Sequence, residues 1–260
     1  LSQLNQLIKS LNGQYLKIHL KLDTGMHRLG FISTEITTLT SILRVNKNLE
    51  VASMFTHLAA ADIPDEDEFT LYQIKTFESL SKQIKIELQI SPFCHVLNSA
   101  GIQRFHDYQF DMVRLGIGLY GVGVDEKEQN LLQHIGVLKT QISQIKHIPK
   151  EETVGYSRRG QLKKDSKIAT IAIGYADGYD RRFSNGVGKV LVNGEFAKVV
   201  GNVCMDMTMI DISKINAKQG DVVILFSEEL TVSELAKSIN TIPYEILTNV
   251  SERVKRVFVR

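Results

Sequence analysis

The first half of the sequence alternates between patterns of β-strands and patterns of α-helices, and this alternation restricts the fold more than any other feature. Short apolar runs predict strands at 18–22, 49–55, 93–97 and 110–113. Between them, apolar residues recur at helical spacing, as in the series Ile36, Leu39 and Leu43. Strands that alternate with helices are typical of parallel α/β folds, and four such units would make half of an eight-unit barrel.

Polar residues gather at the C-terminal ends of these four expected strands. Taken singly, each has an ordinary explanation, because a lone histidine is often a satisfied core residue and Asn-Ser is common in turns. Taken together they predict the active face of a barrel, since the loops that follow parallel strands converge there. The set consists of Lys21, Arg28, His57, Asn98, Ser99 and Arg114.

A glycine-spaced run follows Arg114 and could bind an anion. At Gly116 and Ile117 the backbone can bring its N–H groups close to a negatively charged ligand, and Ser99 supplies a hydroxyl. Glycine runs of this kind are common, so the pattern alone is weak evidence. It is consistent with a cationic site large enough for one phosphate group.

After Gly123 strands dominate the sequence. Apolar runs predict strands at 136–148, 168–173, 208–212 and 221–226, and a hairpin at 189–200 whose turn is Asn193-Gly194. This dipeptide suits a type I′ turn, in which both residues need a positive φ. The capping box from Thr231 to Glu234 predicts one helix. We therefore expect an α/β domain at 1–128 and a mainly β domain at 129–260.

Composition excludes several classes of function. With 260 residues and a formal net charge of +2, the chain gives no reason to expect nucleic acid or an anionic membrane as a partner. Its two cysteines match no disulfide framework and no zinc spacing, so we expect a cytoplasmic protein without a metal site. No apolar run approaches the ~20 residues of a membrane span. Because the sequence opens within a helical pattern, we expect it to be a piece of a longer protein.

Several strings resemble one known family. The stretch K-L-D-T-G-M-H-R-L-G-F at 21–31 resembles the signature of the pyridoxal-phosphate-dependent alanine racemases. The strings at 95–99 and 114–117 resemble the cofactor-binding segments of that family, and those at 153–156, 173–179 and 201–207 its C-terminal domain. The resemblance implies the C-terminal half of a pyridoxal-phosphate-binding (β/α)8 barrel followed by a mainly β domain.

The resemblance also implies roles for single residues. In the first domain the residues expected to bind the cofactor are His57, Asn98, Ser99, Arg114, Gly116 and Ile117. Among these, the serine and the two backbone amides would bind the phosphate, the arginine would bond the ring nitrogen, and the histidine would support the arginine. Lys21 matches a lysine that is carbamylated in some members. Tyr156 matches the base that takes a proton from L-alanine, and the expected substrate contacts are Arg28, Tyr175 and Met205.

An arginine beside the ring nitrogen has a chemical consequence. Pyridoxal phosphate promotes loss of the Cα proton of an amino acid by spreading negative charge into its ring, and an acidic partner would deepen this effect by protonating the ring nitrogen. Arg114 does not give up its proton at working pH, so the nitrogen should stay unprotonated. This favours removal and return of one proton over transamination.

The implied activity is the interconversion of L-alanine and D-alanine for peptidoglycan, in a homodimer whose active sites draw on both chains. No residue matches the Schiff-base lysine of the family, so we expect the chain alone to be inactive and to lack the N-terminal half of the barrel. Glu252 stands where some members carry a tyrosine beside the phosphate. Two alternatives remain: another barrel-type enzyme such as an amino-acid decarboxylase, against which Arg114 speaks, and a non-catalytic fragment.

Overall fold

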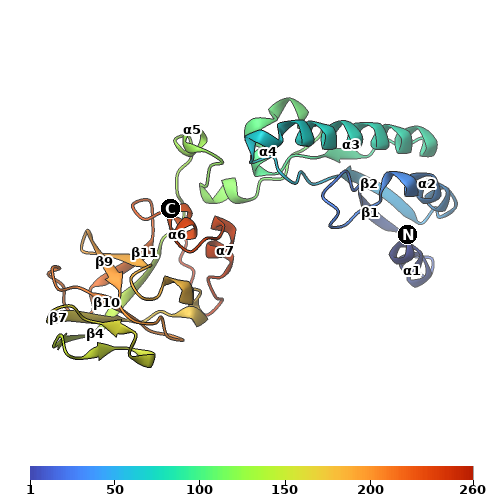
Figure 1. Cartoon of the computed structure of the whole chain (residues 1–260). Helices are drawn as coiled ribbons and strands as arrows, with labels where there is room; N and C mark the ends of the chain where they lie inside the picture. Colours follow the sequence, from blue (N-terminus) through green and yellow to red (C-terminus); the bar gives the residue numbers. More distant parts are fainter. Residues whose placement is uncertain (260) are drawn as a thin grey trace. The chain divides into compact units, whose positions relative to one another are not determined.

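The computed structural model describes residues 1–259, in which the chain forms two compact units (Figure 1). Unit 1 comprises Leu1–Leu119 and Gly123–Leu131, and unit 2 comprises Tyr120–Val122 and the chain from Leu132 onward. The last segment of unit 1 contains the short helix α5 (Glu126–Gln129). Within residues 1–259, no helix has the length and apolar character needed to cross a membrane.

Unit 1 is built on a parallel three-stranded sheet in the order β1-β2-β3. Its strands are β1 (Leu16–Lys21), β2 (Leu49–Phe55) and β3 (Phe93–His95). Its longer helices are α1 (Ser2–Ser10), α2 (Ile36–Val45), α3 (Asp67–Leu88) and α4 (Ser99–Arg104). The apolar faces of α2 and α3 supply much of the core, whose fully buried members include Leu22, Ile36, Leu39, Met54, Ile74, Phe77 and Ile84. The predicted helical spacing is therefore the spacing of the buried face.

The fourth strand expected at 110–113 does not form. Phe110 adopts a left-handed φ of 51°, which interrupts an extended ladder at its first residue. The segment is tied to the region of β3 by single hydrogen bonds, from the Asp111 N–H to the Cys94 carbonyl (3.1 Å) and from the Arg114 N–H to the Leu97 carbonyl (3.0 Å). The expectation of four strand–helix units was wrong for the described residues, and the assignment of unit 1 to half of a barrel is not confirmed.

Unit 2 contains a closed six-stranded barrel in the order β10-β7-β4-β11-β8-β9. Its strands are β4 (Leu138–Ile148), β7 (Ser166–Ile171), β8 (Lys189–Val192), β9 (Glu195–Val199), β10 (Thr208–Asp211) and β11 (Val222–Phe226). A separate two-stranded ribbon consists of β5 (Thr153–Val154) and β6 (Gly160–Gln161), and the helices are α6 (Val232–Ser238) and α7 (Pro243–Thr248). Closure removes the unpaired edges that an open sheet would expose.

Short 3₁₀-helices complete the described chain. They are η1 (Ser33–Glu35), η2 (Pro64–Glu66), η3 (His106–Tyr108), η4 (Ile117–Tyr120), η5 (Tyr156–Arg158), η6 (Tyr175–Asp177) and η7 (Arg181–Phe183). Three of them, η4, η5 and η6, lie within or next to the strings that resemble the racemase family. The segments of interest are thus irregular backbone held by the regular elements around them, as is usual for functional loops.

One local prediction in unit 2 is confirmed in full, and a second, the capping box at Thr231, is confirmed only for the helix start and its threonine cap. The β8–β9 hairpin turns at Asn193 and Gly194, whose φ angles of 49° and 82° are those a type I′ turn requires. Helix α6 begins after Thr231, whose hydroxyl oxygen accepts the N–H of Glu234 at 3.1 Å. The Glu234 carboxylate binds Lys189 at 2.6 Å instead of closing the capping box, so the helix start is also tied to β8.

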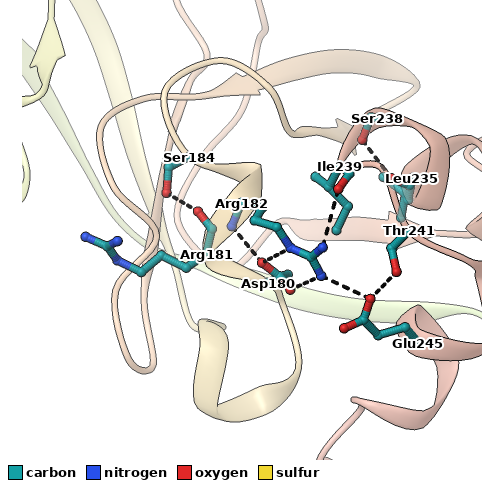
Figure 2. A network of polar contacts seen from close by, with 9 residues as sticks. All are labelled: Asp180, Arg181, Arg182, Ser184, Leu235, Ser238, Ile239, Thr241 and Glu245. Atoms are coloured by element: carbon teal, nitrogen blue, oxygen red, sulfur yellow. Dashed lines mark hydrogen bonds and ion pairs between the residues drawn. The ribbon is translucent and has the colours of Figure 1, made fainter.

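A polar network ties the segment after Tyr175 to helix α7 (Figure 2). The Arg182 guanidinium donates to both carboxylate oxygens of Asp180, at 3.1 and 2.8 Å, and to Glu245 at 3.1 Å. The Thr241 hydroxyl donates to the same Glu245 carboxylate. The hydrogen bond to Asp180 raises the pKa of Arg182 most, and the bond to Glu245 raises it further. The network joins η7 to α7, two elements far apart in the sequence.

Candidate active site

The string with the strongest family resemblance forms a loop that leaves and rejoins the end of β1. The N–H of Asp23 donates to the Phe31 carbonyl and the N–H of Phe31 to the Lys21 carbonyl, both at 2.9 Å. Gly30 has a φ of 122°, and a Cβ there would lie 2.9 Å from the Lys21 carbonyl oxygen. Only glycine allows this closure without strain. The closed loop presents Arg28 as an exposed side chain beyond the strand end.

Four of the predicted site residues lie in one electrostatic environment. Burial lowers the pKa of Lys21, and the charges of Arg28 and Arg114 lower it further. Burial also lowers the pKa of His57 to about 4, with the same two arginines and Lys21 as the next causes. The end of β1, the loops after β1 and β2 and the segment that carries Arg114 therefore bring Lys21, Arg28, His57 and Arg114 close enough to influence one another, although Arg114 does not directly follow a strand.

The Arg114 guanidinium is held at both terminal nitrogens. One terminal nitrogen donates to Nδ1 of His95 at 2.6 Å and to the His95 carbonyl at 3.2 Å. The other donates to the carbonyls of Thr56 (2.8 Å) and Val96 (3.1 Å), and lies 3.4 Å from Nδ1 of His57. Its Nε–H has no hydrogen-bond partner among residues 1–259. One N–H of this guanidinium thus remains available to a ligand.

The two histidines around Arg114 are neutral at pH 7. Burial lowers the pKa of His95 to about 4, followed by the charges of Arg114 and His19. The His95 ring stacks on Phe55 with centroids 5.0 Å apart, and the Arg114 guanidinium lies 5.5 Å from the centre of the same Phe55 ring. Since the described bonds of Arg114 go only to carbonyls and neutral imidazoles, its charge is not cancelled by a carboxylate.

A second group of donors lies at Ser99. The Ser99 hydroxyl oxygen accepts the backbone N–H of Gly116 at 2.8 Å and that of Gly118 at 3.3 Å. The Ile117 N–H has no partner among the described residues. A phosphate oxygen could replace the hydroxyl as acceptor for these amides and take the serine O–H as a further donor. Together with the free Nε–H of Arg114, this donor set fits an anionic cofactor that carries a ring nitrogen.

Asn98 supports this donor group through the backbone. Its side-chain oxygen accepts the N–H of Gly101 at 3.0 Å and so caps the N-terminus of α4, while its amide donates to the Leu58 carbonyl at 3.3 Å. Both polar groups are therefore engaged by the protein. Direct contact of Asn98 with a cofactor remains a prediction. The contacts that Asn98 makes as the cap of α4 place Ser99 at the first position of that helix.

In unit 2 the predicted base, Tyr156, is displayed at the end of the β5–β6 ribbon. Its side chain is 71% exposed, and the two residues after it, Ser157 and Arg158, adopt left-handed φ angles of 58° and 54°. Such backbone is uncommon outside glycine and persists only where neighbouring contacts hold it. One such contact is the side-chain amide of Asn202, which donates to the Tyr156 carbonyl at 3.3 Å.

The three family-like strings of unit 2 come together. Asn202 connects the string at 201–207 to Tyr156, and the N–H of Tyr175 donates to the Cys204 carbonyl at 3.0 Å. The next amide, that of Ala176, donates to the Met205 carbonyl at 2.8 Å. Tyr175 also lines an open cavity of about 470 Å³. The side chains of Tyr156, Tyr175 and Met205 remain substantially exposed, so they are available to a substrate.

Three supporting residues escaped the sequence analysis. Gln73 of α3 is fully buried, and its oxygen accepts the N–H of Ala59 at 2.9 Å. Its amide lies 3.4 Å from the Thr24 hydroxyl and 3.3 Å from the His57 carbonyl, so it links the loops after β1 and β2. The available signal was a glutamine on the apolar face of a helix. The other two are the buried Ser53 of β2 and Asp177, which binds Arg253 at 2.9 Å.

Comparison with known proteins identifies the family. A family model described as "Alanine racemase, N-terminal domain" matches residues 1–124, and one described as "Alanine racemase, C-terminal domain" matches residues 135–258. An alanine racemase of Helicobacter pylori is 39% identical over 94% of this chain and 68% of its own length. The chain belongs to the alanine racemase family. Both family domains are represented, so the expectation that the N-terminal half of the barrel is missing is not borne out.

Other racemases agree with this assignment. "Alanine racemase 1" of Oceanobacillus iheyensis is 38% identical over 94% of this chain and 66% of its own length. The crystal structure of the alanine racemase of Bacillus anthracis with bound L-Ala-P superposes with a TM-score of 0.89 at 32% identity, over 100% of this chain and 69% of that one. A structure from Streptomyces lavendulae gives 0.91 at 26% identity, over 99% and 70%. The chain spans about two thirds of the length of these relatives.

Proposed function

We propose that this protein interconverts L-alanine and D-alanine with pyridoxal phosphate as its cofactor. The observation that carries the proposal is the cationic Arg114, which keeps one free N–H and stands among neutral imidazoles in the same unit as the Ser99 donor group. Family membership supplies the reaction, because the racemases compared above share both domains with this chain. D-alanine made in this way would serve peptidoglycan synthesis.

The residues of unit 1 would hold the cofactor. Ser99, Gly116 and Ile117 would provide a hydroxyl and backbone N–H groups for its phosphate, and the Arg114 Nε–H would donate to its ring nitrogen without giving up its proton. When bound, the cofactor would lower the barrier to removal of the Cα proton by spreading negative charge into its ring. His57 and the backbone carbonyls around Arg114 keep the guanidinium in place.

The residues of unit 2 would handle the proton. Tyr156 would take the Cα proton of L-alanine at its phenolic oxygen and return it in the reverse direction, because racemisation needs an acid–base group on each face of a planar carbanion. Tyr175 and Met205 would line the space for the substrate, and Arg28 would contribute its charge from the loop after β1. In a homodimer the tyrosine would serve the partner's cofactor site, and a two-fold axis would create two identical shared sites.

Lys21 is a candidate for carbamylation. Its lowered pKa, caused by burial and by the charge of Arg28, increases the fraction of neutral amine, which is the form that reacts with carbon dioxide. The carbamate would carry a negative charge and would balance the neighbouring arginines. Mass spectrometry under native conditions, with and without bicarbonate, would detect the adduct, and Lys21→Arg should abolish it.

A decarboxylase is the second candidate, and the surroundings of Arg114 disfavour it. A decarboxylase needs an acidic partner that protonates the ring nitrogen. Here the expected partner is Arg114, whose described hydrogen bonds go to two neutral histidines and three carbonyls, with no carboxylic acid among them. A non-catalytic chain is the third. Racemisation of L-alanine without release of carbon dioxide would support the proposal, and release of carbon dioxide from an amino acid would support the decarboxylase.

The test uses the complete gene product and residues 1–260 in parallel, since the chain spans about two thirds of its relatives' length. Added pyridoxal phosphate should give a protein-bound absorbance band, and the gene product should racemise L-alanine. Tyr156→Phe should reduce exchange of the Cα proton of L-alanine by ~10²-fold, the usual worth of a positioned base. Tyr72→Phe, at an exposed tyrosine of α3, is the matched control and should leave exchange unchanged. No racemisation by the cofactor-loaded gene product would overturn the proposal.

A further inference from the structure

A chain of hydrogen bonds extends from Arg114 across the sheet of unit 1 to a histidine that none of the proposed roles involves. The Arg114 guanidinium contacts Nδ1 of His95 at 2.6 Å, and Nε2 of His95 lies 3.3 Å from the hydroxyl oxygen of Ser53. The same hydroxyl lies 2.5 Å from Nδ1 of His19. Ser53 and His95 are buried, with 3% and 5% of their surfaces exposed, whereas His19 is exposed. This series of hydrogen bonds therefore begins at the proposed cofactor site and ends at a side chain that is exposed in residues 1–259.

An irregularity in the sheet creates this alignment. Strands β1 and β2 pair with Ile18 opposite Val51, but the register shifts by one residue so that His19 lies opposite Ser53. Without the shift His19 would face Ala52. Irregularities of this kind re-aim side chains and are frequent beside active sites. On the other side of β2, Phe55 is opposite His95, which places the His95 ring within reach of Ser53.

The chemistry of arginine fixes the direction of the first two hydrogen bonds in this series. A guanidinium only donates, so Nδ1 of His95 must accept and its proton must be on Nε2. That Nε2–H then donates to the Ser53 oxygen, and the Ser53 O–H can in turn donate to Nδ1 of His19, the direction that the proposal below requires. If His95 were protonated on both nitrogens, its Nδ1–H and the Arg114 N–H would both be donors and could not form a hydrogen bond. Burial agrees with this assignment, because it is the largest cause that lowers the pKa of His95 to about 4.

We propose that Ser53 and His19 are positioning residues, which hold His95 as the Nε2–H tautomer and thereby fix the direction in which Arg114 presents its free Nε–H. The part that concerns tautomers stands on the geometry of unit 1 alone. The part that concerns a ring nitrogen rests on the proposed function. The acceptors at the terminal nitrogens of Arg114 prevent rotation of the guanidinium, and the strongest contact by distance is the one that His95 supplies.

Nitrogen NMR of the histidine side chains tests the tautomers directly. In ¹⁵N-labelled protein without cofactor at pH 7, His95 should show an unprotonated Nδ1 and a protonated Nε2, and His19 should show an unprotonated Nδ1. His95→Gln and His19→Asn spectra assign the two signals. If His95 carries its proton on Nδ1, or is doubly protonated at pH 7, the directed chain does not exist and the proposal is overturned.

Variants at the exposed end of the chain test the positioning role with little risk to folding. His19→Leu removes the acceptor for the Ser53 hydroxyl, whereas His19→Asn can offer an oxygen close to the place of Nδ1. We expect faster hydrogen exchange at the Arg114 Nε–H in His19→Leu and recovery in His19→Asn. His147→Leu, at an exposed histidine of β4, is the control and should leave hydrogen exchange at the Arg114 Nε–H unchanged. Equal exchange in all four proteins would refute a role in positioning.

Ligand affinities test whether this series of hydrogen bonds affects binding at the ring nitrogen of pyridoxal phosphate. Ser53→Ala leaves the buried Nε2–H of His95 without an acceptor, and we expect it to weaken binding of pyridoxal phosphate roughly 5- to 10-fold, about the worth of one hydrogen bond. Binding of inorganic phosphate should not change, because its donors are at Ser99 and Gly116. Equal loss for both ligands would show general disorder and overturn the proposal. If the unaltered protein binds no pyridoxal phosphate, the proposed function fails while the tautomer result stands on its own.

Discussion

Acid should destabilise unit 1 through His95, and replacing this one side chain should remove the effect. Burial lowers the pKa of His95 to about 4 from an ordinary value of 6.5. Between these two values the unfolded chain binds a proton that the folded chain does not, so the free energy of unfolding falls as the pH falls. The loss begins near pH 6.5 and is complete below about pH 4.

The size of the effect follows from the shift. Each pH unit within the window is worth about 1.36 kcal/mol per proton, so the 1.5 units between pH 6.5 and 5 correspond to about 2 kcal/mol. His95 is only 5% exposed, so solvent screens this term little. His57 has a similarly lowered pKa but is only half-buried, and its contribution should be smaller. His95→Phe keeps a flat ring against Phe55 and cannot take up a proton.

The assay must resolve unit 1 from unit 2, because a single unfolding midpoint is not well defined for a chain of two compact units. Hydrogen exchange of peptides from β2 and β3, measured at pH 7 and pH 5 and corrected for intrinsic rates, gives the local free energy of opening. The original protein should lose about 2 kcal/mol more than His95→Phe between the two pH values. If both lose the same amount, His95 is not a buried neutral histidine and the tautomer argument fails with it.

Three further outcomes are expected. Gln73→Leu, which removes the hydrogen-bond partner of the Ala59 N–H and of the His57 carbonyl, should lower the stability of unit 1 by about 1–3 kcal/mol, seen as faster exchange in the loops after β1 and β2. Asp177→Asn should weaken the contact to Arg253 and speed exchange at 250–256 without changing unit 1. In the complete gene product, Tyr156→Phe and Arg114→Ala, each nearly inactive, should recover roughly a quarter of the original activity when refolded together, since half of randomly mixed dimers hold one intact shared site. A mixture that stays inactive although mixed dimers form would place the whole site within one chain.

Local patterns were predicted well because they depend on local physics. The strand expected at 49–55 coincides with β2, since a short, mostly apolar stretch between polar segments leaves little choice of boundaries. The turn at Asn193 and Gly194 was predicted because few other dipeptides accept two positive φ angles. The segment at 110–113 shows the limit of this reasoning. Its composition suits a strand, but Phe110 adopts a left-handed φ and its ring packs edge-on against Phe77 of α3, with centroids 5.6 Å apart, a contact that the segment itself does not reveal.

Partner choice in the sheets was not predictable. In unit 2, β4 pairs with both β7 and β11, and β10 lies between β7 and β9. The alternation of apolar residues marks which faces of these strands are buried but does not say which strands are neighbours. The sequence therefore predicted a mainly β domain without its closed barrel. The same limit hid the link between Tyr175 and Met205, which rests on backbone hydrogen bonds between segments about thirty residues apart.

The net charge of the site cannot be read from the sequence, although the proposed chemistry depends on it. The sequence shows Arg114 and two histidines, but whether they form a doubly cationic cluster or a cation with neutral partners depends on burial. The structure decides this, because burial lowers the pKa of both His57 and His95 to about 4. A cation surrounded by neutral acceptors keeps its charge for an anionic cofactor and cannot pass a proton to the ring nitrogen. Because burial keeps His95 neutral and Arg114 can only donate, Nδ1 of His95 accepts from Arg114 and its Nε2–H donates to Ser53, so the direction of these hydrogen bonds depends on the same burial that sets the charge of the site.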